Sequence, residues 1–171
     1  LLLWFFSNVF FHGQVFIPKM SDLHLGYYSW GYHFKMMMDG GVFPLWNPLS
    51  FCGYPFGANG FSSVNFLNLL GVLMRDLNLA WNITILANIF LAAFFMYLYM
   101  KKVGFAGFSG IISGIIFGFS PSNASYIDGW AFFLPLVLWL SEEYFASRKI
   151  GYLLLCGLSF CVMFLNVSPQ Y

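Results

Sequence analysis

Long runs without charged residues constrain the fold of this chain more than any other sequence feature. From Leu79 to Met100 there is no Asp, Glu, Lys or Arg, and the run stops at Lys101-Lys102. A helix of about 20 apolar residues is long enough to cross the hydrocarbon core of a bilayer. The whole chain is 8% charged and 60% hydrophobic, whereas soluble domains carry about 25% charged residues. The pattern predicts an all-α, polytopic transmembrane helix bundle.

Five apolar runs are predicted to be membrane-spanning helices. The first is a truncated span at residues 1–16, because the chain starts inside an apolar run without a charged flank. After a long loop at residues 17–78, the other four spans are expected at 79–100, 104–120, 130–145 and 150–167. We therefore expect the chain to be the N-terminal part of a longer protein.

Basic residues set the expected orientation of these spans. Lys101-Lys102 lie between the second and third spans, and Arg148-Lys149 lie between the fourth and fifth. If every span crosses, both clusters fall on the same side, and short cytoplasmic loops collect Lys and Arg. The loop at residues 17–78 is then expected outside an inner (plasma) membrane.

Small and polar residues within the spans predict helix packing. Gly110, Gly114 and Gly118 recur every fourth residue, so they share one helix face and allow close approach of a neighbouring backbone. Interhelical hydrogen bonds are the simplest expectation for the polar residues in or near spans, which are Asn82, Asn88 and Asn166.

Several function classes are disfavoured by what the sequence lacks. A net charge of +1 offers no electrostatic footprint for nucleic acid. The three cysteines match no metal or redox motif, and no phosphate-binding glycine loop is present. No charged residue lies in the middle of a span, so nothing marks an ion or proton relay. Chemistry is therefore expected at the outer face, on a substrate that is not a nucleotide.

The outer loop is predicted to contain interfacial structure of its own. Residues 23–38 read as a helix whose many Tyr and Trp side chains favour the membrane interface. Asp39-Gly40-Gly41 is expected to end it, because Gly readily adopts left-handed backbone angles. Two prolines make residues 44–48 a stiff turn region. A second short interfacial helix is expected at residues 65–74.

Asp22 is the ionisable residue of most interest in this loop. It follows the first span, where a carboxylate can be partly desolvated and still reach water, so it is suited to accept a proton or hold a divalent cation. An equally open interpretation is a helix-start residue that complements the macrodipole. His24 is close enough in sequence to share a metal with Asp22, although two residues do not define a site.

The loop resembles the YfhO-like family of bacterial membrane proteins, which belong to the GT-C class of glycosyltransferases. The residues that carry the resemblance are Gly-Gly-Val-Phe-Pro-Leu-Trp-Asn-Pro, ending at Pro48, and Gly-Tyr-Pro-Phe-Gly-Ala-Asn, from Gly53 to Asn59. The terminal Val-Ser-Pro-Gln stretch is similar to the family's Gly-His-Pro-Gln element, with Val167 and Ser168 replacing Gly and His.

The resemblance implies a GT-C-like helix bundle that moves a sugar from a polyprenyl-phosphate lipid to an acceptor at the outer membrane face. By position, Asp22 is the implied catalytic or metal-binding residue, with a divalent cation as an optional cofactor. Lys19, Lys35 or Arg75 would stabilise the departing phosphate. Trp46, Tyr54 and Phe56 would wall the sugar pocket, or else anchor the loop at the interface. The expected substrate-binding residues are His24, Lys35, Trp46, Asn47, Tyr54, Asn59 and Arg75.

A non-catalytic membrane protein is the alternative prediction: a lipid-sugar flippase, a transporter or an envelope assembly scaffold. The loop would then be a lid or a docking surface. Transporters usually place polar groups and broken helices near the bilayer midplane. The predicted spans show little of this pattern, which favours the enzyme.

Overall fold

The computed structural model describes Ser7, Gly31 and residues 35–42, 45–47, 52–55, 73–74, 77–120 and 132–166. The chain divides into two compact units, the first comprising Leu1–Thr84 with Ser168–Tyr171 and the second Ile85–Val167. The described residues are mostly helical, which confirms the helical part of the predicted fold class. One two-stranded ladder in the first unit is the exception.

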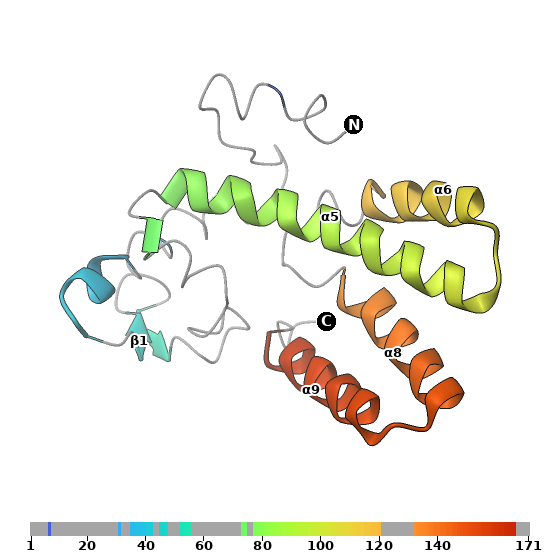
Figure 1. Ribbon diagram of the computed structural model, residues 1–171. Coiled ribbons are helices and arrows are strands. Elements are labelled where there is room, and N and C mark those ends of the chain that lie inside the picture. The colour runs from blue at the N-terminus through green and yellow to red at the C-terminus, as the bar shows by residue number, and fades with distance from the viewer. Residues whose placement is uncertain are drawn as a thin grey trace. The chain divides into compact units, whose positions relative to one another are not determined.

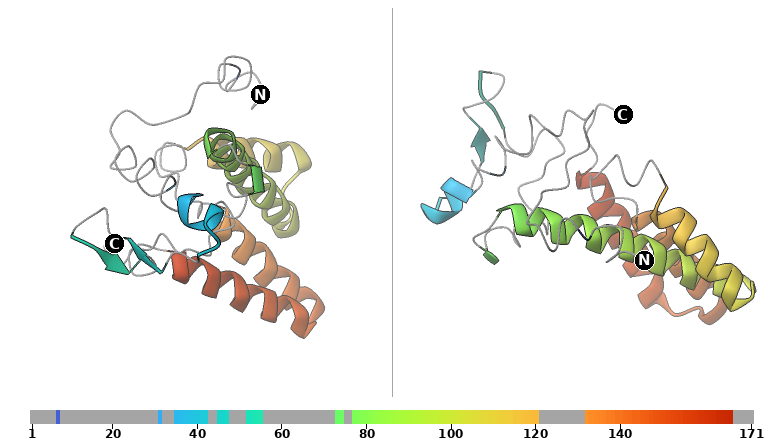
Figure 2. Two further views of the ribbon diagram at one scale, coloured as in Figure 1. Left: turned by 90° about the vertical axis from the view of Figure 1, so that its left-hand side faces the viewer. Right: turned by 90° about the horizontal axis from the view of Figure 1, so that it is seen from above.

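Four helices make up the regular structure of the second unit (Figure 1). They are α5 (Leu77–Val103), which begins in the first unit, α6 (Gly107–Gly118), α8 (Phe133–Ser147) and α9 (Ile150–Asn166). The sequence predicts spans at 79–100, 104–120, 130–145 and 150–167. Helix α5 encloses the first of these runs, α6 and α9 lie within theirs, and α8 overlaps its run but is shifted toward the C-terminus. Figure 2 shows α5 beside α6 and α8 beside α9 as two helical hairpins.

Glycine ends α5 and allows the chain to turn into α6. The amide of Gly104 donates to the carbonyl of Lys101, and the amide of Phe105 donates to that of Met100. With Gly104 at φ +100°, these bonds form a Schellman motif, which satisfies carbonyls that a helix end leaves without partners. Only Gly104 to Ala106 separate the two helices.

The glycine face of α6 packs directly on α5. A Cβ on Gly114 would lie 2.6 Å from the carbonyl oxygen of Ala93, and one on Gly118 would lie 3.0 Å from that of Ile89. A Cβ on Gly110 would meet the ring of Tyr97 at 3.1 Å. All three glycines are buried. This confirms the prediction that the glycine repeat serves close helix packing.

The two hairpins of the second unit meet through aromatic side chains. Phe95 of α5 stacks with Trp139 of α8 at a centroid separation of 6.2 Å, and with Phe132 at 6.4 Å. Offset aromatic pairs at this distance are favourable beyond their buried area. Pro135 and Leu140 are the buried residues of α8.

The α8–α9 hairpin turns on two residues, Arg148 and Lys149. Arg148 has φ 53°, and its amide donates to the carbonyl of Tyr144 at 2.7 Å. The Ser147 hydroxyl donates to the carbonyl of Glu143 and accepts from the amide of Lys149. Such short connections are typical of antiparallel helix pairs.

One described helix is long and apolar enough to cross a membrane, namely the Ile85–Val103 segment of α5. Helix α6 and the Ile150–Met163 segment of α9 are apolar but shorter. The sequence predicts several full-length spans, and in the described part of the chain a single helix has the length and composition of one.

One described asparagine of α5, Asn88, departs from the expected interhelical hydrogen bonds. Asn82 is buried and makes an interaction. The buried side-chain nitrogen of Asn88 has no hydrogen-bond acceptor in the described structure. A buried amide donor left without an acceptor costs about 1–3 kcal/mol, so Asn88 weakens rather than strengthens α5 packing here.

Candidate functional site

Four of the predicted site residues fall in the described part of the loop: Lys35, Trp46, Asn47 and Tyr54. The predicted residues outside the described ranges are Lys19, Asp22, His24, Phe56, Asn59 and Arg75. The expected helix at 65–74 is described only at Leu73 and Met74, which are helical.

Lys35 begins a described helical segment that runs to Asp39. The amide of Gly41 donates to the carbonyl of Met38, and the amide of Val42 donates to that of Met37. With Gly41 at φ +70°, this is again a Schellman motif. The prediction that Asp39-Gly40-Gly41 ends a helix is confirmed, and the turn directs the chain toward the Pro-Leu-Trp-Asn-Pro stretch.

The two halves of the loop motif pair as an antiparallel ladder. Strand β1 (Trp46–Asn47) lies opposite β2 (Tyr54–Pro55), with Trp46 facing Pro55 and Asn47 facing Tyr54 in register. The sequence predicted a turn region at 44–48, and that prediction was wrong for residues 46–47, which are extended. Proline is acceptable here because a two-strand ladder leaves one side of each strand without a partner strand.

The ladder brings together three residues that sequence reasoning assigned to substrate binding. Trp46, Asn47 and Tyr54 lie eight residues apart at most, and the pairing places Asn47 directly across from Tyr54. The short connection between the strands contains Cys52 at φ 61° and Gly53 at φ +98°. Positive φ is the backbone region that favours glycine, so Gly53 suits the position directly before β2.

Gly53 is required for a second reason, which is its contact with Trp46. A Cβ at Gly53 would lie 2.9 Å from both Nε1 and Cζ2 of the indole. The indole therefore lies against the backbone of the turn, while 51% of Trp46 remains exposed. A half-exposed aromatic ring held against the backbone is suited to pack on an apolar part of a ligand.

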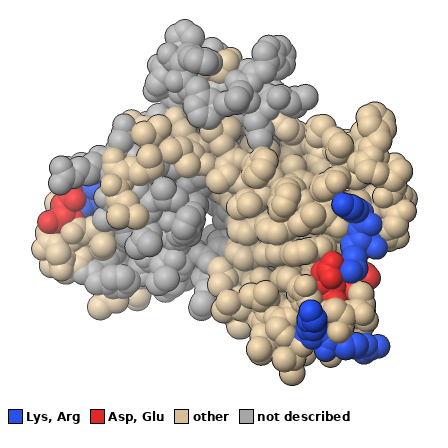
Figure 3. All heavy atoms as spheres, in the orientation of Figure 1, with Lys and Arg blue, Asp and Glu red and all other residues tan. Residues whose placement is uncertain are grey.

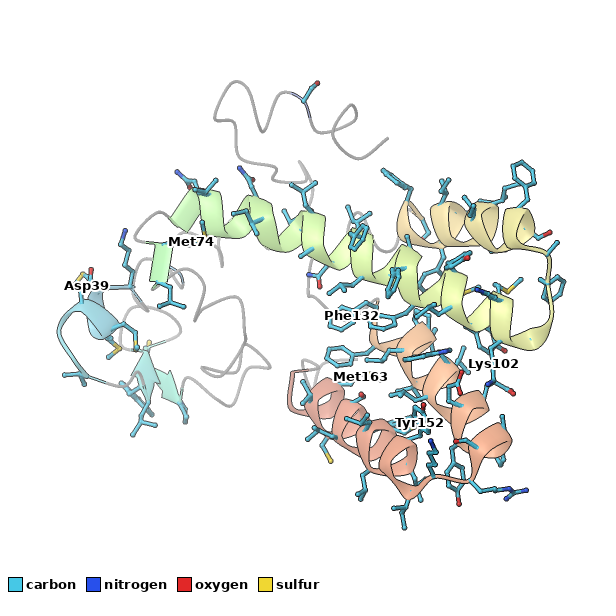
Figure 4. All side chains as sticks on the ribbon, in the orientation of Figure 1. Asp39, Met74, Lys102, Phe132, Tyr152 and Met163 are labelled. Atoms are coloured by element: carbon cyan, nitrogen blue, oxygen red, sulfur yellow. The ribbon has the colours of Figure 1, made fainter. Side chains whose placement is uncertain are left out.

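A separate set of polar residues gathers at one end of the second unit. Its described charged residues are Lys101, Lys102, Glu142, Glu143, Arg148 and Lys149, and Figure 3 shows them together over the ends of α5 and α8. Lys102, labelled near the end of α5 in Figure 4, has its Nζ 2.9 Å from Glu143 Oε1. The sequence analysis used the four basic residues of this set but did not predict this ion pair, because nothing local in the sequence signals a contact between α5 and α8.

No group of three or more His, Cys, Asp or Glu residues that could hold a metal occurs within the described ranges. The sequence analysis considered a divalent cation bound at Asp22, and Asp22 lies outside the described residues. The described part of the loop offers an exposed indole, the Asn47 amide on a short peptide ladder, the Lys35 ammonium, the Asp39 carboxylate and the Cys52 thiol. These groups are suited to binding and orienting a ligand.

Comparison with protein-family models, curated proteins and solved structures finds no match to this chain.

Proposed function

We propose that this protein is a membrane glycosyltransferase of the GT-C type. It transfers a sugar from a polyprenyl-phosphate lipid to an acceptor at the outer face of a plasma membrane. The observation that carries the proposal is the pairing of Trp46–Asn47 with Tyr54–Pro55. That pairing joins the two loop segments whose sequence resembles the YfhO-like family, and it leaves an indole open beside them.

Membrane placement is supported by the character of the helices in the second unit. The Ile85–Val103 segment of α5 is long and apolar, yet only 17% of its most apolar window is buried. A core helix of a soluble protein would be mostly buried. Large apolar side chains are also exposed on α6 and α9, including Phe108, Ile116 and Leu154. Lipid is a favourable solvent for such surfaces, whereas water is not.

The proposed orientation follows from the charged end of the second unit. Lys101 and Lys102 at the end of α5 lie with Arg148 and Lys149 at the end of α8. Short basic connections are retained on the cytoplasmic side. We infer that this end is cytoplasmic and that the loop at 17–78 is extracytoplasmic, where lipid-linked sugars are presented to transferases of this class.

The proposed reaction is one displacement at the anomeric carbon. Asp22 takes the proton of the acceptor hydroxyl as its oxygen forms a bond to that carbon. The bond from the carbon to the phosphate oxygen breaks, and polyprenyl phosphate leaves with the electron pair. Lys35, with Arg75 or Lys19, offsets the charge on the departing phosphate. Trp46 packs on the sugar ring and orients it.

The test is sugar transfer by the full-length protein in proteoliposomes that contain polyprenyl-phosphate sugars. Asp22→Asn should lower kcat by about 100-fold or more, because general base catalysis contributes about 10²–10⁴-fold. Trp46→Ala should raise KM about tenfold with a smaller change in kcat, and Trp46→Phe should recover most of the loss, since an aromatic face is retained. Leu45→Ala, an exposed neighbour, is the matched control.

Unchanged transfer by Asp22→Asn, at equal expression, would remove Asp22 from the mechanism. If the wild-type protein moves lipid-linked sugars across the bilayer without transferring them, the non-catalytic alternative holds instead.

A further inference from the structure

The charged end of the second unit contains one cation in an ion pair and three exposed cations. Lys102 is paired with Glu143, and the two side chains are 29% and 22% exposed. Lys101, Arg148 and Lys149 are exposed, and no ion pair joins them to another residue within the described ranges. The internal pair therefore neutralises itself, and the charges that remain at this end are three exposed cations and the half-buried Glu142 carboxylate, an excess of positive charge.

Exposed apolar side chains lie directly next to these three cations. Val103 and Phe105 follow Lys101 at the α5–α6 turn, and Ile150 follows Lys149 at the start of α9. A surface that is cationic at its edge and apolar just beyond matches a molecule with an anionic head and hydrocarbon chains. Arg adds a planar fork of donors that fits phosphate oxygens in a bidentate manner.

We propose that Lys101, Arg148 and Lys149 form a binding surface for the headgroup of an anionic phospholipid on the cytoplasmic leaflet. The inference rests on the membrane placement in the proposed function and deepens it by naming a lipid class and its residues. The Lys102–Glu143 ion pair joins α5 to α8 beside these three cations. Juxtamembrane cations attract anionic lipids with about a fivefold gain each.

The experiment measures the preference of the full-length protein for spin-labelled phosphatidylglycerol over phosphatidylcholine in proteoliposomes. The triple variant Lys101→Gln, Arg148→Gln, Lys149→Gln should reduce this preference about fivefold or more. The matched control, Lys102→Gln with Glu143→Gln, removes two charges of opposite sign and should retain most of it. Raising the salt concentration should weaken the wild-type preference, because exposed charges are screened.

A wild-type protein without a preference for phosphatidylglycerol would overturn the inference, as would an equal loss in the paired control. Two further measurements separate this failure from failure of the proposed function. Resistance to alkaline extraction reports membrane integration, and sugar transfer in liposomes without phosphatidylglycerol reports activity. An integral, active protein without lipid preference would contradict only the lipid surface.

Discussion

Glycine has different structural roles in the second unit and in the described loop. In α6, Gly110, Gly114 and Gly118 have ordinary helical geometry, and what matters is the missing side chain that lets α5 approach. In the loop, Gly41 and Gly53 have positive φ, and what matters is the backbone conformation they permit. The same residue type therefore allows close helix packing in α6 and permits left-handed backbone turns in the loop.

The largest expected effect comes from adding a methyl group to the helix contact. Gly114→Ala would place a Cβ 2.6 Å from a backbone carbonyl of Ala93, which cannot move aside as a side chain can. We expect the free energy of unfolding in mild detergent to fall by roughly 1–3 kcal/mol, as for other overpacked interiors. The control is Gly157→Ala in α9, where a Cβ meets nothing within 4 Å.

Gly157→Ala should leave stability unchanged or raise it by up to about 1 kcal/mol, because Ala favours helix more than Gly. If both variants lose stability equally, the close contact of Gly114 with the Ala93 backbone is not the reason that α6 requires glycine.

The second effect tests the loop. Gly53→Ala combines a left-handed backbone, which costs a non-glycine residue about 1–2 kcal/mol, with a Cβ at 2.9 Å from the Trp46 indole. Hydrogen exchange of residues 45–55 should accelerate, and sugar transfer should fall. Gly41→Ala carries the backbone cost without a side-chain collision.

Gly41→Ala should therefore leave exchange in residues 45–55 slower than Gly53→Ala does. Equal acceleration in the two variants would show that Trp46 does not rest on the turn. Exchange at wild-type rates in Gly53→Ala would show that the left-handed turn is dispensable.

A smaller effect is expected where the two helical hairpins meet. A double-mutant cycle between Phe95→Leu and Trp139→Leu should give a coupling of about 0.5–1.5 kcal/mol in unfolding free energy, the usual range for aromatic pairs. Phe90 and Phe94, whose rings stack along α5 itself at 6.1 Å, are the matched control within one helix. A double-mutant cycle on Phe90 and Phe94 measures an aromatic contact within α5 only. Substitutions at Phe95 and Trp139 should therefore change the efficiency of cross-linking between α5 and α8, and substitutions at Phe90 and Phe94 should not.

The smallest expected effect concerns the ion pair. Lys102→Gln with Glu143→Gln should show a coupling below about 1 kcal/mol, because a partly exposed pair gains little over its hydrated ions. The coupling should fall as salt rises. Lys101→Gln with Glu143→Gln is the control and should show no comparable coupling; a similar value would mean that general charge, not the Lys102 contact, is measured.

Sequence reasoning performed differently in the two regions, for physical reasons. The spacing of Gly110, Gly114 and Gly118 indicates a packing face because helix periodicity is regular. The end of the loop helix at Gly41 was also foreseen, since left-handed glycine has a local signature. By contrast, the β1–β2 pairing and the Lys102–Glu143 contact join positions that only the folded chain brings together. Asp22 remains a prediction from its position alone.

The length of α6 has a consequence for the bilayer itself. Its 12 residues rise about 18 Å as an α-helix, against a hydrocarbon core of about 30 Å. In the membrane placement proposed above, α6 would be shorter than the hydrocarbon core, and bilayers relieve such a hydrophobic mismatch by thinning around the short element. Beside α6, the two leaflets would then draw closer together, which shortens the distance that a lipid headgroup must travel to pass between them.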